Sequence, residues 1–338
     1  MILRRELDWL LPSALLTFGL GIVAMIGISP LKGSPDLWLP LWSWAALGGV
    51  FLILWSAIFL MALAFKGVRA PACAYVELAR QLRPRLPSIA AGIALAGLDL
   101  YFFMWLKPQL NALRPFWADS QLAGIGKFLF GQDAWHFLTF LLQEWVGILY
   151  TPVWFTMLVA TLYYVLLKPP SKRRSRLLIT YFLLWSVFGP IGQYFWPSGG
   201  PIFYERIYGS HRYDELVARL PHVTRLASDY LWDAYQRKVL SYGAGISAMP
   251  SLHDASVTWA AIAFHREHWL LRFVAYAFAL FVLLSSVALG WHFSADGIVA
   301  VAGTILCYWL SSLIRKLAAQ VTGVEPRQAN EAFRERAT

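Results

Sequence analysis

The chain has 338 residues, of which 58% are hydrophobic, 16% are aromatic and only 14% are charged. Soluble domains carry about 25% charged residues, so this composition excludes an ordinary soluble domain and indicates one polytopic membrane domain. The net charge of +10 does not indicate a nucleic-acid partner, because Lys and Arg gather in short segments between apolar runs. The only cysteines, Cys73 and Cys307, predict no disulfide framework.

The first apolar run follows a basic start at Arg4 and Arg5 and extends for about 20 residues. It is long for a signal-peptide core and matches a spanning helix, so we expect it to stay in the membrane. The same criterion predicts an all-α, polytopic membrane helix bundle with about eight transmembrane helices. The expected spans are 9–28, 41–65, 88–106, 150–167, 176–195, 251–265, 270–290 and 295–314.

Two further segments are expected outside the crossings. The stretch 134–149 contains His136 and Glu144 in an apolar sequence, which favours an interfacial or re-entrant helix over another span. The segment 197–250 mixes acidic and basic side chains in a balance typical of a folded cap rather than a disordered arm.

With eight spans, the most basic connections all fall on one side of the membrane. The positive-inside rule makes that side cytoplasmic, together with both termini, and places 197–250 outside. We therefore expect an integral membrane protein of a bacterial inner membrane, with its active site facing the periplasm. The basic residues are Arg4, Arg5, Lys66, Arg69, Arg80, Arg83, Arg85, Lys168, Lys172, Arg173, Arg174, Arg176, Arg266, Arg272, Arg315 and Lys316.

Two histidines occur where apolar runs meet polar turns. His253 lies in SAMPSLHDAS at the outer start of the sixth span, and His292 lies in SSVALGWHFSAD at the outer end of the seventh. Asp296 follows His292 by four residues, so a helix would place both on one face. A carboxylate can orient a nucleophilic histidine, and a second histidine can protonate a leaving group. Interfacial histidines that only satisfy backbone carbonyls are the alternative, but ionisable residues in membranes favour function.

These motifs resemble those of a known family. A-M-P-S-L-H (248–253) and S-S-x-x-x-x-x-H-x-x-x-D (285–296) are similar to the second and third signatures of the type 2 phosphatidic acid phosphatase superfamily. Leu252 stands where most members have glycine, as in the branch that contains the inositol phosphorylceramide synthases. The resemblance implies that His292 forms a phosphoenzyme, Asp296 orients it and His253 protonates the leaving group. A histidine nucleophile makes a metal-activated water unnecessary, so we expect no metal and no cofactor.

The third signature usually has an arginine where this chain has Ser286, so another cation must neutralise the transferring phosphate. Lys107 and Arg114 match the first signature, K-x-x-x-x-x-x-R-P, although such residues at a span end are often snorkelling anchors. Arg206 in PSGGPIFYER is the first choice, with Tyr204 beside it, because the glycines let backbone amides approach an anion. A tight turn with a surface arginine is the alternative.

Two other polar residues have two interpretations each. Ser251, beside His253, is a candidate phosphate donor, or it is only the N-cap of the sixth span. Asp99 is a lone carboxylate in the third span that either contacts a headgroup or makes a structural hydrogen bond.

The motifs predict a metal-independent lipid phosphotransferase that moves a phospholipid headgroup to a sugar, inositol or lipid alcohol. A phosphatase acting on a lipid phosphate or polyprenyl diphosphate, with water as acceptor, is the alternative. A transporter or scaffold with a histidine proton relay is a remote one, because no inverted repeat is visible. We expect supporting helices at 1–87, a catalytic domain at 88–316 with its exoplasmic cap at 197–250, and a cytoplasmic tail at 317–338.

Overall fold

The computed structural model describes residues 6–26, 31 and 38–323 of the chain. Every element with defined bounds in these ranges is helical, which confirms the all-α prediction. The α-helices are α2 (Leu7–Ile26), α3 (Trp38–Phe65), α4 (Pro71–Leu82), α5 (Leu86–Leu113), α6 (Asp119–Phe130), α7 (Glu144–Ile148), α8 (Trp154–Leu167), α9 (Lys172–Leu183), α10 (Gly189–Phe195), α11 (Tyr204–Tyr208), α12 (Asp214–Ala218), α13 (His222–Arg237), α14 (Leu252–Phe264), α15 (Trp269–Ala288) and α16 (Ser294–Thr322).

Seven helices in the described part of the chain are long and apolar enough to cross a membrane. Three of them are composite: a 3₁₀ turn at Arg83–Arg85 joins α4 to α5, a π-helical turn at Leu149–Val153 joins α7 to α8, and another at Leu184–Phe188 joins α9 to α10. The remaining predicted span, 251–265, forms α14, which has 13 residues and packs against α15 and α16. The protein is therefore an integral membrane helix bundle, in agreement with the composition.

The stretch 134–149 adds no crossing of its own, but its two halves differ. Ala134–Leu141 forms a 3₁₀ helix, whereas α7 is the first turn of the span that ends at Leu167. Residues 144–149 therefore extend the predicted span 150–167 at its start instead of forming a helix of their own, and 134–149 adds no further crossing, as predicted. Glu144 does not exclude a crossing because it is exposed, and its carboxylate accepts hydrogen bonds from the backbone amides of His222 (2.5 Å) and Val223 (3.3 Å). These amides start α13, where a helix favours a negative charge.

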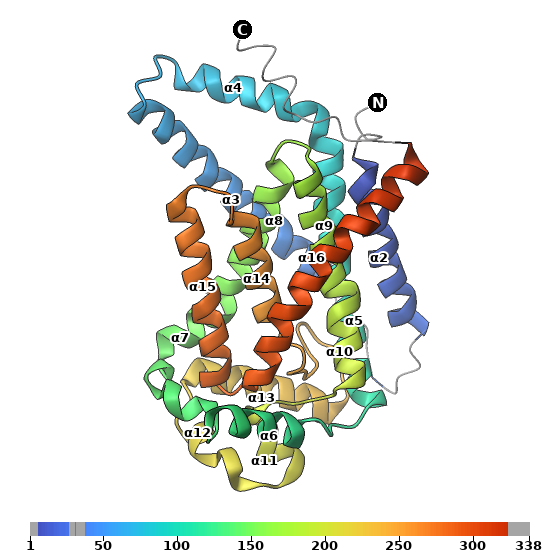
Figure 1. Cartoon of the computed structure of the whole chain (residues 1–338), viewed down its shortest axis with the longest axis vertical. Coiled ribbons are helices and arrows are strands. Elements are labelled where there is room, and N and C mark those ends of the chain that lie inside the picture. Colours follow the sequence, from blue (N-terminus) through green and yellow to red (C-terminus); the bar gives the residue numbers. More distant parts are fainter. Residues whose placement is uncertain (1–5, 27–30, 32–37, 324–338) are drawn as a thin grey trace.

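The long helices run side by side between two ends of the molecule (Figure 1). At the lower end of the view, α6, α11, α12 and α13 form a cap beneath the bundle. Helix α4 lies across the opposite end. The cap therefore combines the predicted segment 197–250 with α6, which comes from much earlier in the chain.

Charged contacts join the connections at the end opposite the cap. Lys168 forms an ion pair with Glu267 at 2.8 Å, and Arg315 lies 3.7 Å from Asp8. Arg85 donates to the carbonyl of Lys168 at 2.6 Å. Segments that the charge pattern assigned to one side of the membrane thus share one end of the bundle, while the side itself stays a prediction.

Helices α3 and α15 form much of the outer surface of the bundle. Many of their apolar side chains are exposed, including Ile53 and Phe273, and acyl chains would solvate such a surface in a bilayer. Helix α2 packs against α5, α9 and α16, as a supporting helix would, although the domain division at residue 87 stays a prediction. Helix α16 continues to Thr322, and residues 324–338 of the predicted tail lie outside the described residues.

Two exposed positions test the orientation in the membrane. Gly209 lies in the cap, and Ser171 lies in the connection before α9 at the opposite end. We expect a reporter fused at Gly209 to be active only outside the cytoplasm, and one at Ser171 only inside it. Alkaline phosphatase and a fluorescent protein as paired reporters would check this expectation. The opposite pattern would place the cap in the cytoplasm and contradict the predicted topology.

Candidate active site

The imidazole of His253 lies in an aromatic sandwich at the start of α14. Its ring stacks on Tyr150 with centroids 4.6 Å apart and planes 13° apart, and it lies 3.9 Å from the ring of Trp154. The Trp154 indole donates to Ser256 at 2.7 Å, which fixes the indole against α14. Ser251 caps α14 by accepting from the amide of Asp254 at 3.2 Å, as the capping interpretation predicted. The backbone and the two aromatic rings thus hold His253 in place.

His292 lies in the turn between α15 and α16, and its ring centroid is 6.3 Å from that of His253. Its Nδ1 atom lies 2.6 Å from the carbonyl oxygen of Ala248. A carbonyl can only accept, so Nδ1 carries the proton and Nε2 keeps its lone pair. The sequence motif that contains His253 therefore sets the tautomer of the second histidine.

Asp296 is fully buried beside His292, but it is not the nearest partner of the ring. Its Oδ2 atom is 3.6 Å from Nδ1 of His292, which is longer than a hydrogen bond. The same oxygen accepts from the amide of Phe293 at 2.8 Å. Asp296 thus places a negative charge next to the imidazole, whereas the Ala248 carbonyl accepts the hydrogen bond that the sequence assigned to Asp296.

The glycine loop of PSGGPIFYER already holds an anion, the carboxylate of Asp119. This carboxylate accepts from the amides of Gly199 (3.0 Å) and Gly200 (2.7 Å), from the Ser198 hydroxyl (2.9 Å) and from the Tyr208 phenol (2.8 Å). The expectation that these glycine amides approach a substrate anion is therefore wrong for this structure. The glycines are needed for close packing, because a Cβ on Gly200, at φ +90°, would meet the Trp291 carbonyl oxygen at 2.4 Å.

Arg206 and Tyr204 lie in the cap and do not line the cavity that holds the two histidines. Arg206 forms an ion pair with Asp229 at 2.5 Å and stands over the ring of Trp232. Tyr204 is buried among the rings of other cap tyrosines, with Tyr213 at a centroid distance of 5.1 Å. Both residues therefore have partners within the cap.

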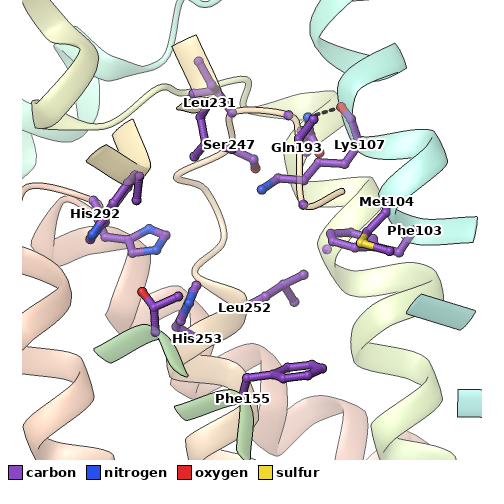
Figure 2. Close-up of a pocket in the computed structure, with 18 of the residues that line it drawn as sticks. Phe103, Met104, Lys107, Phe155, Gln193, Leu231, Ser247, Leu252, His253 and His292 are labelled. Atoms are coloured by element: carbon purple, nitrogen blue, oxygen red, sulfur yellow. Dashed lines mark hydrogen bonds between the residues drawn. The ribbon is translucent and has the colours of Figure 1, made fainter. Parts of the chain in front are cut away.

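Lys107 is the candidate cation that lies in the histidine cavity. Its side chain extends into the cavity toward His292 (Figure 2), and no acidic side chain in the described part of the chain forms an ion pair with it. Arg114, at the other end of the same motif, stacks on Tyr194 at 4.9 Å and does not line the cavity. Between them, Asn111 donates to the carbonyl of Ile246 (2.6 Å) and accepts from its amide (2.8 Å).

One cavity of about 440 Å³ joins these groups. Figure 2 shows Phe103, Met104 and Phe155 toward one end of it and Ser247, Gln193 and Lys107 at the other, with the two histidines along one side. The apolar end lies among α5, α8 and the α9–α10 span, and the polar end lies under α13 and residues 242–247. The cavity thus has the form of a site for an amphiphile whose polar group reaches the histidines.

Two other polar residues singled out in the sequence, Ser286 and Asp99, do not line the cavity. Ser286, in the place of the usual arginine, is fully buried and donates to the Leu283 carbonyl (2.8 Å) and to Asp254 (3.3 Å). Asp99 accepts from Ser186 at 2.6 Å inside the bundle, which supports the structural interpretation. Within the described residues, no three His, Cys, Asp or Glu side chains gather in a way that could hold a metal ion.

A model of the PAP2 superfamily matches residues 129–310, which is more than half of the chain. The chain belongs to the PAP2 superfamily. This superfamily comprises lipid phosphatases and phosphotransferases that generally act without a metal. No curated protein and no solved structure matches the chain. The match contains His253, His292 and Asp296 but begins after α5, so the position of Lys107 comes from the structure.

Four residues around this PAP2 site were not predicted from the sequence as participants: Tyr150, Asp119, Asn111 and Gln193. Each is buried and acts through a partner that is distant in the sequence, such as Ile246 for Asn111. Asn111 lies inside the K-x-x-x-x-x-x-R-P motif, so that motif was the one available signal for it. The other three residues have no local pattern that marks them.

Proposed function

We propose that this protein transfers a phosphoryl or substituted phosphoryl group from a membrane lipid to an alcohol through a phosphohistidine at His292. The observation that carries the proposal is that His292, His253 and Lys107 line one cavity, which has an apolar end and a polar end, as a site for an amphiphile would. A free Nε2 nucleophile, a second imidazole and an unpaired cation are the three groups that metal-independent phosphoryl transfer requires.

The first step exchanges one bond to phosphorus for another. Nε2 of His292 attacks phosphorus, the bond from phosphorus to the leaving alcohol breaks, and the leaving oxygen takes a proton from His253. In the second step an acceptor hydroxyl gives its proton to His253 and attacks phosphorus, and the N–P bond breaks. The proton stays on Nδ1 of His292, which donates it as a hydrogen bond to the Ala248 carbonyl, and this keeps Nε2 as the reacting atom throughout.

Lys107 supplies the charge that the missing arginine would supply. Ser286 donates to Asp254 of α14 and does not line the cavity, whereas Lys107 approaches the histidines from α5. Gly245 allows this approach, because a Cβ at this residue, with φ +95°, would lie 2.9 Å from both Lys107 Cγ and Pro108 N. We therefore prefer Lys107 over Arg206 and Arg114. Ser251 is fully buried as the N-cap of α14 and does not line the cavity, so we assign it no contact with the phosphate.

The cap over the cavity favours an alcohol over water as acceptor. Side chains from α13 and residues 242–247 cover the polar end, and excluding water protects a reactive phosphohistidine from hydrolysis. We therefore prefer a headgroup transferase, as in the branch of the inositol phosphorylceramide synthases, over a phosphatase. The donor would be a phospholipid or an isoprenoid phosphate, and the acceptor a sugar, inositol or lipid alcohol. Product analysis of the purified protein with labelled lipid, with and without alcohols, tests this preference.

The choice of cation gives a direct test. Replacing Lys107 with Met keeps the length of the side chain and removes its charge, so we expect kcat to fall about 10²–10³-fold. Arg206→Ala should change kcat much less, because Arg206 is paired with Asp229 outside the cavity. Rates of product release from a labelled lipid phosphate measure both effects.

Lys127→Met is the matched control for this comparison. Lys127 is exposed on α6 and does not line the cavity, so the variant should keep the activity of the parent. A well-folded Lys107→Met variant with parental activity, beside an inactive Arg206→Ala variant, would restore Arg206 as the phosphate-binding cation and contradict this part of the proposal.

A further inference from the structure

Gln193 of α10 is a buried polar residue in the cavity for which the reaction steps above have no role. Its side chain is 2% exposed and lies beside Lys107 at the polar end of the cavity (Figure 2). Its Nε2 atom donates to the backbone carbonyl of Lys107 at 2.8 Å, whereas its Oε1 atom has no hydrogen-bond partner. An unsatisfied buried amide oxygen is costly, so this atom is a candidate contact for a ligand.

The orientation of this amide decides what kind of ligand group it can bind. The Lys107 carbonyl can only accept, so the nitrogen of the Gln193 amide must face it, and this leaves Oε1 as the atom without a partner in a side chain that lines the cavity. The free Oε1 atom is an acceptor without a proton of its own. It therefore does not match the oxygens of an ionised phosphate, which are also acceptors, and it does match a hydroxyl group.

The surroundings of Gln193 extend this polar region toward the cap. Ser247 lines the same end of the cavity, and its hydroxyl makes only a 3.4 Å contact with the Met249 carbonyl. Both hydrogen bonds of Asn111 to Ile246 tie this segment to the end of α5. A rigid segment and a fixed amide thus border a space beside the reacting histidines, on the side away from the apolar end.

We infer that Gln193 and Ser247 form a subsite for a second hydroxyl group of a polyol whose first hydroxyl group reacts at His292. This inference rests on the proposed function, since it names the class of alcohol that the transferase accepts. The polyol could be the free acceptor, or it could be the headgroup of the donor lipid, because both must place an oxygen on the same phosphorus. Its hydroxyl donates to Oε1 of Gln193 and accepts from Ser247.

A pair of alcohols tests the subsite on the unmodified protein. Glycerol and propan-1-ol both offer a primary hydroxyl, but only glycerol has further hydroxyls for Gln193. With labelled phosphatidic acid as donor, we expect glycerol to capture the phosphoryl group with about tenfold higher kcat/KM than propan-1-ol. The yields of glycerol phosphate, propyl phosphate and inorganic phosphate measure this preference. Equal capture of the two alcohols would overturn the inference for a free acceptor and would leave only the donor headgroup as the polyol.

A variant identifies the residue that gives the preference. In Gln193→Leu the amide oxygen is absent, so the variant should use glycerol and propan-1-ol about equally well. Removing the protein oxygen, or the ligand hydroxyl that donates to it, should cost about as much as removing both, because they form one hydrogen bond. Ser247→Ala should lower the preference partly. Gln121→Leu, at an exposed position of α6, should keep the full preference. A full preference in Gln193→Leu would also overturn the inference.

Two further measurements distinguish a free acceptor from a donor headgroup as the source of the hydroxyl, and the polyol subsite from the proposed function. If the subsite holds the donor headgroup, phosphatidylglycerol should form the phosphoenzyme about tenfold faster than phosphatidylpropanol, and Gln193→Leu should remove this difference. Absence of any phosphohistidine would refute the proposed function itself. Formation of phosphohistidine, with neither alcohol pair discriminated, would refute only the polyol subsite.

Discussion

His292→Ala is expected to abolish both turnover and the covalent intermediate. The variant removes Nε2, the one atom that forms the bond to phosphorus, and a water molecule in the cavity is not a comparable nucleophile that could replace it. The backbone of the turn should persist, because the amide of residue 292 bonds to the Ser286 carbonyl and not through the side chain. Denaturing the protein during turnover of a labelled lipid phosphate, and counting the label bound through an acid-labile bond, measures the intermediate.

His211 provides the matched control for this experiment. It is an exposed histidine of the cap that pairs with Asp214, and it does not line the cavity. His211→Ala should therefore keep both the label and the turnover of the parent. If His292→Ala still carried the label, the nucleophile would be another residue. If no variant and no parent protein carried label while the lipid was moved, a transporter would fit better than an enzyme.

The sequence predicted that His253 and His292 belong to one site, and the structure does place both in one cavity, because each signal for them is local. His253 and His292 both stand at helix ends, where an apolar run stops at a membrane boundary, and this fixes their depth without knowledge of the packing. The four-residue spacing correctly predicted that Asp296 lies near His292, but the reason differs, because His292 is in the turn before α16 and Asp296 is held in the first turn of that helix by the Phe293 amide. The spans were predicted for the same reason, since a bilayer requires about 20 apolar residues wherever the helix packs.

The cation that lies in the histidine cavity could not be predicted in this way. Arg206 was the first choice from the sequence, but only tertiary partners separate it from Lys107: Asp229 pairs with Arg206, while Lys107 lines the cavity and lacks an acidic partner in the described part of the chain. The glycine loop was misassigned for a similar reason. Its amides do bind an anion, but the anion is Asp119, about 80 residues earlier in the chain. Competition between an internal carboxylate and a substrate is decided by tertiary structure.

His253→Ala is expected to slow formation of the phosphoenzyme by roughly 10²–10⁴-fold, the usual effect of losing a general acid. The variant leaves the nucleophile and its hydrogen bond to Ala248 in place, so the label should still appear, only more slowly. Tyr150 and Trp154 hold the imidazole of His253 by ring contacts. Rapid-quench measurement of label on the protein gives the rate.

A substrate with a better leaving group is the control that isolates this role. A p-nitrophenyl phosphate ester needs no protonation of its leaving oxygen, so the His253→Ala variant should recover most of its lost rate with it. If His253 only packs against Tyr150 and Trp154, its loss would distort the site and slow the reactions of both substrates equally. An equal loss for both substrates would therefore assign His253 a structural role. Recovery limited to the activated ester identifies His253 as the group that delivers the proton.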